Sequence, residues 1–225
     1  MEDIEYLNDD MLTVVNHKEL FEISMYNDRT TLRDIEEFAS FVNACKYAVR
    51  RLGEYKAFKA QLAEMGLTRC QILGYIESNM DDDVDIEMHH GPLLTLFDYC
   101  AIVIDALLFR GEPVSSFRVA RYVMDEHWKG HVQVVMLSKT VHQLVNSGEM
   151  FIHFNQATGN VNEFIKSWYE GITPDRAEKI NHYIDMCEQF DTFDNGLLDI
   201  RHTITDWNYD VALARMLDQK SSEHG

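Results

Sequence analysis

The sequence predicts a mostly helical α+β protein. Two short segments, Val84–His90 and Val132–Leu137, have the alternating or valine-rich composition of β-strands. The stretches before, between and after them carry apolar residues at intervals of three and four, which is typical of helices packed on a core. With 225 residues, the chain is long enough to bury a sizeable core, as one domain or as two small ones. We divide it into three predicted regions, residues 1–80, 81–171 and 172–225.

The first region is expected to be helical. One apolar stripe is formed by Ile35, Phe38, Val42, Cys45, Val49 and Leu52. The same spacing continues beyond Gly53, and Gly66 is expected to end the helix because glycine readily adopts the left-handed conformation that follows many helices. Thr68–Gln71 matches a capping box, which predicts a short helix to about Asn79.

The central region begins with an acidic turn at Asp81–Asp83. The predicted strand Val84–His90 follows and ends at Gly91-Pro92. Leu93–Phe109 is apolar nearly all round, which predicts a buried helix.

A second helix of the central region is expected to start at a cap on Ser115 or Ser116 and to run to about Trp128. The valine-rich strand Val132–Leu137 comes next. These elements place two helices between the two predicted strands.

The remaining elements follow from local signals. Ser138 is expected to cap a helix that ends before Gly148, and Met150–Phe154 is predicted to be a further strand. Thr173-Pro174 predicts the start of a C-terminal helix, because proline is favoured at the first helical position.

The composition argues against several classes of protein. The net charge is −18, so the surface repels DNA at long range, and DNA binding would need a local basic patch. The four cysteines are far apart and form no C-x-x-C pair, which argues against a zinc knuckle or a redox dithiol. No signal peptide is recognisable, and the longest apolar run, Ala101–Phe109, is too short to span a bilayer. We therefore expect a cytoplasmic protein without a membrane partner.

Four side chains with metal-binding chemistry are predicted to meet in the central region. His89 and His90 stand at the end of the first predicted strand. His142 and Asn146 are four residues apart, so they share one face of the predicted helix. Such a set can bind one divalent metal beside one general base, and it can cleave phosphodiesters.

These residues resemble the motif of the HNH endonuclease family. Its members have a ββα-metal fold, in which paired histidines end a strand and a later helix carries a His and a further His or Asn. The match covers about Val84–His90 and Val132–Gly148, and the stretch from Glu87 to about Tyr169 also resembles HNH-type proteins of large bacteriophages. The resemblance implies a ββα-metal core with a helical insertion at about residues 93–128, flanked by N- and C-terminal helices.

The resemblance also implies a role for each residue. His90 would be the general base that activates water, and His89, His142 and Asn146 would hold the metal. Gln133 stands where the family's central Asn orients the loop and the base. The implied function is a metal-dependent endonuclease that hydrolyses DNA phosphodiester bonds. Mg²⁺ or Mn²⁺ is the expected metal, with Ni²⁺ or Zn²⁺ as alternatives. Phosphate contacts are expected from Arg118, Arg121, Lys129 and Lys139.

Departures from the family pattern favour a second interpretation. Gln133 replaces Asn, Asn146 replaces His, and the family's structural cysteines are absent. A regular strand would also point His89 and His90 to opposite faces. With the acidic charge, these departures favour a catalytically inactive binding or assembly protein on a degenerate HNH scaffold, with a protein partner. A phage protein of either kind would be expected in the host cytoplasm.

Three further polar residues are expected to have structural or solvent-exposed roles rather than functional ones. His127 and His131 flank a break at Gly130, so they are expected to be exposed or to cap the helix. Glu87 shares a strand face with His89 and could add a carboxylate to the site, but a solvated acidic turn and strand is the expected role of this acidic run.

Overall fold

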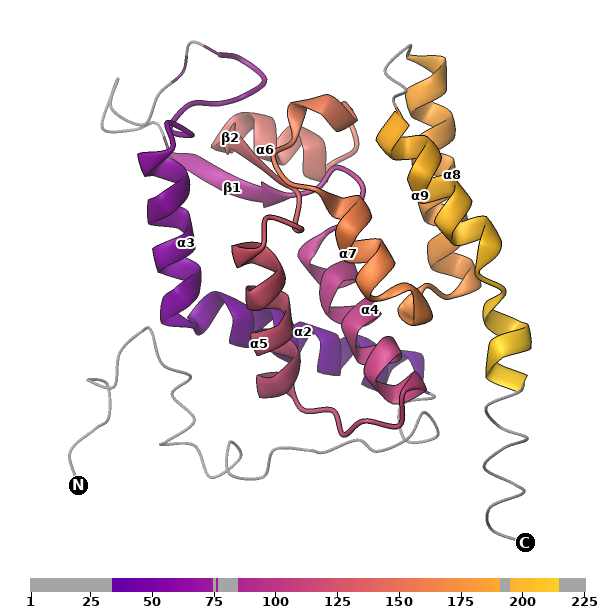
Figure 1. Cartoon of the computed structure of the whole chain (residues 1–225). Helices are drawn as coiled ribbons and strands as arrows, with labels where there is room; N and C mark the ends of the chain where they lie inside the picture. Colours follow the sequence, from indigo (N-terminus) through magenta and orange to yellow (C-terminus); the bar gives the residue numbers. More distant parts are fainter. Residues whose placement is uncertain (1–33, 75, 77–84, 191–194, 215–225) are drawn as a thin grey trace, which may run out of the picture.

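The computed structural model describes residues 34–74, 76, 85–190 and 195–214. Helices dominate this part of the chain, and its strands form one two-stranded sheet (Figure 1). The prediction of a mostly helical α+β protein is therefore confirmed. The division into three regions stays a prediction.

The first described helices are α2 (Ile35–Arg51) and α3 (Gly53–Glu64). Asp34 caps α2 by accepting hydrogen bonds from the Glu36 and Glu37 amides at 2.8 and 2.9 Å. The predicted stripe is split at Leu52, whose extended backbone separates the two helices. The helix predicted after Thr68 is not seen as far as residue 74, where the chain makes turns, and residues 75 and 77–79 lie outside the described ranges.

The sheet pairs β1 (Ile86–His90) with β2 (Val134–Ser138). The strands are antiparallel, and the register sets Ile86 opposite Ser138 and His90 opposite Val134. The first strand therefore starts at residue 86 among the described residues, while the predicted start at residue 84 lies outside them. All five residues of β2 are buried, so this strand is covered on both faces.

Two helices, α4 (Leu96–Phe109) and α5 (Ser116–Trp128), lie between the strands in sequence. Thr95 and Asp98 form a reciprocal capping box at the start of α4, and Ser115 caps α5 through the Arg118 amide. Helix α4 is buried almost all round and packs against α2 and α5, which agrees with its uniformly apolar sequence.

The helix α6 (Lys139–Asn146) follows β2 without a loop. The later elements are η3 (Phe154–Gln156), α7 (Val161–Ser167), η4 (Tyr169–Gly171), α8 (Pro174–Gln189) and α9 (Asn195–Asp206). Pro174 occupies the first turn of α8, as predicted. Figure 1 shows α8 and α9 side by side at one edge of the molecule.

The predicted strand Met150–Phe154 is wrong. Residues 150–153 adopt no regular structure, and Phe154 begins η3. Thr158, beyond this segment, forms an isolated antiparallel bridge with Val134 of β2. Ile152 is still buried, in a small cluster with Cys70, Val135 and Leu137, which explains its apolar character.

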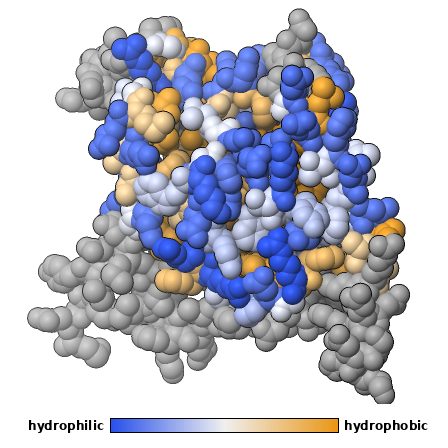
Figure 2. Space-filling view, viewed as in Figure 1, coloured by the Kyte–Doolittle hydropathy of each residue, from blue (hydrophilic) through white to orange (hydrophobic). Residues whose placement is uncertain are grey.

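The main core extends from α2 to α9 and is built around α4. Figure 2 shows that hydrophilic residues cover most of one face of the molecule, with smaller hydrophobic areas between them. None of the helices in the described ranges has the length and apolar character needed to cross a bilayer.

Gly171 is the tightest point of this packing. A Cβ at this position would lie 2.0 Å from the carbonyl oxygen of Ile102 in α4. We expect Gly171→Ala to lower the free energy of unfolding by about 2–3 kcal/mol, because a backbone atom must move to make room. Urea denaturation would measure this loss.

Gly111→Ala is the comparison for this variant. Its Cβ would meet nothing within 4 Å, but its φ of +71° is unfavourable for alanine, so a loss of about 1 kcal/mol is expected. Equal losses in the two variants would contradict the close approach at Gly171.

Candidate functional site

The end of β1 points its two histidines in different directions, as strand alternation requires. His90 is buried and its Nε2 lies 3.0 Å from Nε2 of His127 in α5. The His89 ring lies beside the His142 ring of α6, with 5.0 Å between the ring centres. The structure thus brings His89 close to His142, as expected, but gives His90 a different partner.

The His90–His127 pair is a buried hydrogen-bonded unit. Nδ1 of His127 lies 2.7 Å from the Val123 carbonyl oxygen, which can only accept, so this nitrogen carries a proton. In neutral His127 the other nitrogen, Nε2, is then the acceptor, and His90 donates to it from its own Nε2. Tyr55 stacks on His90 and Phe58 meets His127 edge-on, which encloses the pair in aromatic rings.

The surroundings of these histidines favour their neutral forms. Burial lowers the pKa of His127 to about 4. Burial also holds the pKa of His90 well below its usual value, and the charges of His127, Arg50 and His89 lower it further. Burial and the neighbouring His142 lower the pKa of His89 to about 4. His89, His90 and His127 are therefore uncharged at pH 7.

His142 is held by a carboxylate from the first strand. Its Nδ1 lies within hydrogen-bonding distance of Glu87 Oε2. This contact links α6 to β1 and orients the imidazole that faces His89. Asn146, one turn further along α6, lines the same cavity as both histidines.

A cavity of about 340 Å³ connects these elements. It lies between α2, the end of β1, the start of α4 and α6. Its walls are formed by Lys46, Arg50, Met88, His89, His90, Thr95, Leu96, Phe97, His142 and Asn146. All four predicted His and Asn residues of the site therefore border one cavity.

Gln133 lies away from this cavity. Its side chain is buried, and its Oε1 has no hydrogen-bond partner among the described residues. Its backbone amide donates to the Tyr99 hydroxyl at 2.9 Å, and its carbonyl oxygen accepts from the Gly91 amide at 3.3 Å. The backbone of Gln133 thus ties the start of β2 to α4 and to the turn after β1.

We expect Tyr99→Phe to lower the free energy of unfolding by about 1–3 kcal/mol, because it leaves the buried Gln133 N–H without an acceptor. Tyr122→Phe is the matched control. The half-buried Tyr122 hydroxyl accepts from Arg118, and Arg118 has other acceptors. Thermal and urea unfolding of the two variants would measure the difference, and a Tyr99→Phe protein as stable as wild type would contradict the assignment.

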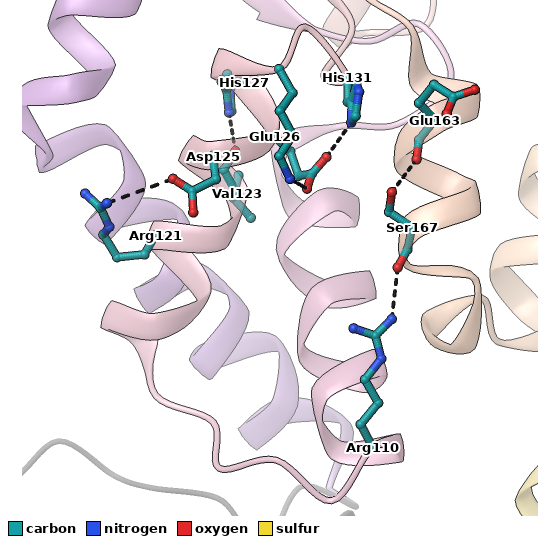
Figure 3. A network of polar contacts seen from close by, with 10 residues as sticks. Arg110, Arg121, Val123, Asp125, Glu126, His127, His131, Glu163 and Ser167 are labelled. Carbon is teal, nitrogen blue, oxygen red and sulfur yellow. Dashed lines mark hydrogen bonds and ion pairs between the residues drawn. The ribbon is translucent and has the colours of Figure 1, made fainter.

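The four predicted phosphate-binding residues do not gather at the cavity. Arg118 pairs with Glu112 at the other end of α5. Lys129 donates to Glu126 at 2.8 Å. The same carboxylate accepts from His131 Nδ1 at 2.7 Å, and Figure 3 shows this second contact. Glu126 is almost completely buried, so these two contacts provide the charge and hydrogen bonding that it needs.

Arg121 is also engaged by carboxylates. It pairs with Glu54 of α3 and lies 3.9 Å from Asp125. Figure 3 shows the contact with Asp125 on the same helix. Lys139 is exposed at the start of α6. Three of the four cations are thus neutralised by the chain itself, which leaves no basic track for a DNA backbone along α5.

The expected metal-binding character is not supported by the side chains present. In the described ranges, no group of three or more His, Cys, Asp or Glu side chains is placed to hold a metal ion. His90, the predicted general base, has its Nε2 hydrogen-bonded to His127. The choice of Mg²⁺, Mn²⁺, Ni²⁺ or Zn²⁺ stays an untested prediction.

Sequence reasoning missed the role of His127. His127 was expected to be exposed or capping, but it is buried because α5 continues through Trp128 and breaks only at Gly130. Its spacing from Val119, Ala120 and Val123 on the buried face of α5 is the signal that could have placed it. Lys46 and Arg50 belong to a dense basic cluster, for which the sequence allows either contacts with a DNA backbone or the solvated face of a helix. Their four-residue spacing puts them on one face of α2.

Comparison with known proteins identifies the family. A family model described as bacteriophage G278-like virion protein matches residues 2–208. The chain belongs to this family. No curated protein and no solved structure matches it. The family match covers nearly the whole chain, including both strands and the helix α6.

Membership of the G278-like virion protein family corrects the functional prediction. The resemblance to HNH endonucleases is wrong, and so is the prediction of a metal-dependent DNA endonuclease. The motif rested on residue spacing, and the structure explains why spacing misled: His90 is a buried partner of His127. The suggested phage origin is supported, whereas DNA as a partner is not.

Proposed function

We propose that this chain is a structural or assembly component of a bacteriophage particle and acts by contact with other virion proteins. The family match over residues 2–208 carries the proposal. A role in the virion also agrees with the protein partner that the acidic net charge of −18 suggested. The proposed location is the assembled particle, reached after synthesis in the host cell.

The charge distribution supports a role in protein contacts. Most basic side chains in the described ranges have carboxylate partners, so the acidic excess remains at the surface. Such a surface disfavours a nucleic-acid backbone and suits basic or polar protein surfaces. The continuous core from α2 to α9 provides a stable body for such contacts.

A nonsense mutation early in the gene tests the proposal. We expect infected cells to produce fewer complete particles, or particles that lack a defined part by electron microscopy. A host that suppresses the nonsense codon should restore them. Normal yield, morphology and infectivity without the protein would contradict a structural or assembly role.

A further inference from the structure

The cavity between α2, β1, α4 and α6 differs in charge from the rest of the protein. The chain has 38 acidic and 20 basic residues. Among the described residues that line the cavity, however, the charged ones are Lys46 and Arg50, and no Asp or Glu is present. The protein therefore has a concave surface lined by cations, although its net charge is strongly negative.

These two cations also differ from most of the other described basic side chains in their partners. Carboxylate partners are found for Arg110, Arg118, Arg121, Lys129, Lys166, Arg176, Lys179 and Arg201. Within the part of the chain that the structure describes, neither Lys46 nor Arg50 forms an ion pair with a carboxylate. Lys46 Nζ donates to Asn43 Oδ1 at 3.1 Å and lies 5.6 Å from the centre of the Phe97 ring. Arg50 shares a side-chain hydrogen bond with the neutral Tyr55 hydroxyl. Neither positive charge is therefore balanced by a carboxylate among the described residues.

The remaining polar groups of the cavity can add hydrogen bonds to the same ligand. Lys46 and Arg50 come from one face of α2, four residues apart, and His142 and Asn146 come from one face of α6. An arginine offers paired N–H groups that match the two oxygens of a carboxylate or phosphate. The amide N–H groups of Asn146 are further donors to such oxygens, while the N–H on His142 Nδ1 faces Glu87.

The nearby carboxylates lie outside the lining of this cavity. Glu87 accepts from His142 and, with Asp85, lines an adjoining hollow that Arg50 also borders. Asp98 accepts from the Thr95 hydroxyl and from Lys179 Nζ at 2.6 Å. The volume of about 340 Å³ is at the lower end of small-ligand pockets, which suits a compact group.

We propose that this cavity binds a compact oxyanion, a carboxylate or a phosphate group, with Arg50 and Lys46 as its charged contacts. The proposal goes beyond the role in the virion and does not depend on it. Arg50 is exposed at the mouth and Lys46 is half-buried, so a ligand reaches Arg50 first and becomes desolvated beside Lys46.

Titration of the full chain with simple anions tests the proposal. Sodium phosphate and sodium succinate would be added at constant ionic strength, with sodium chloride as reference. Binding would be followed by the ring signals of His89 and His142 in NMR spectra. We expect saturable shifts with at least one oxyanion. Saturation by phosphate alone, by succinate alone or by both would identify the phosphate, the carboxylate or either group as the ligand.

Two variants of neighbouring arginines make the test specific. Arg50→Gln should weaken binding roughly tenfold to a hundredfold, as expected for the loss of a charged hydrogen bond. Arg51→Gln makes the same charge change at the next position, outside the cavity lining, and should bind within about twofold of wild type. Lys46→Gln provides a second variant inside the cavity. Shifts that fail to saturate beyond the chloride reference, or unchanged binding by folded Arg50→Gln, would overturn the proposal.

Discussion

Replacing Arg176 with methionine is expected to lower the free energy of unfolding by about 3–5 kcal/mol. Arg176 Nη1 lies 2.6 Å from Oδ2 of Asp105, a residue buried in α4. The same nitrogen donates to the Gly171 carbonyl oxygen at 2.7 Å. Without the guanidinium, the buried carboxylate loses this charged hydrogen bond, and weakening a buried ion pair is among the most destabilising changes a protein can undergo.

Arg201→Met is the matched control for this prediction. Arg201 pairs with Asp185 and Glu188, both exposed, so its removal should cost less than about 1 kcal/mol. Adding Asp105→Asn to Arg176→Met should recover part of the loss by removing the buried charge. Urea unfolding would measure all three proteins. Similar losses for Arg176→Met and Arg201→Met would show that the buried pair is not a major source of stability.

The second large effect is a loss of stability in mild acid, caused by the His90–His127 pair. The pKa of His127 is lowered to about 4 in the folded protein and that of His90 is also well below its usual value, whereas in the unfolded chain both return to about 6.5. The unfolded state therefore binds more protons as the pH falls from about 6.5 toward 4. Stability is fully present above this window and decreases within it, by up to roughly 3 kcal/mol per pH unit for both groups together.

Urea unfolding between pH 8 and pH 4.5 would measure this dependence. The double variant His90→Gln/His127→Gln cannot take up these protons, so its stability should change less steeply over the same range. The difference between the two slopes isolates the pair from the carboxylates that also titrate in acid. Identical slopes would contradict the assignment of two neutral buried histidines.

Local signals in the sequence predicted much of the helical framework. Ser115 caps α5 and Pro174 starts α8, because caps and first-turn prolines act over a few residues. The uniformly apolar segment before Phe109 became the central helix α4. Signals of this kind depend on neighbours along the chain, so one sequence is enough to detect them.

Features set by distant contacts were not predicted. The segment after Met150 has an apolar composition like that of a strand, but Thr158 makes the bridge to β2. The placement of His90 depends on His127, which lies two elements later. Such contacts are fixed by the packing of α5 on the sheet, which residue spacing in one chain does not reveal.

The candidate site was likewise predicted only in part. His89, His142 and Asn146 were predicted to lie together, and they border one cavity. The pattern of histidines suggested a metal, which stays an untested prediction, while the cations Lys46 and Arg50 come from the basic cluster of α2. The proposed anion site would be distributed over four elements, and such a site has no compact sequence signature.

The most direct test of the central claim is quantitative mass spectrometry of phage particles purified through a density gradient and washed in high salt. The proposed role in the virion predicts this protein in the particles at a fixed ratio to the major capsid protein, unchanged by the wash. Its absence from the particles, with normal amounts in the infected-cell lysate, would contradict the claim.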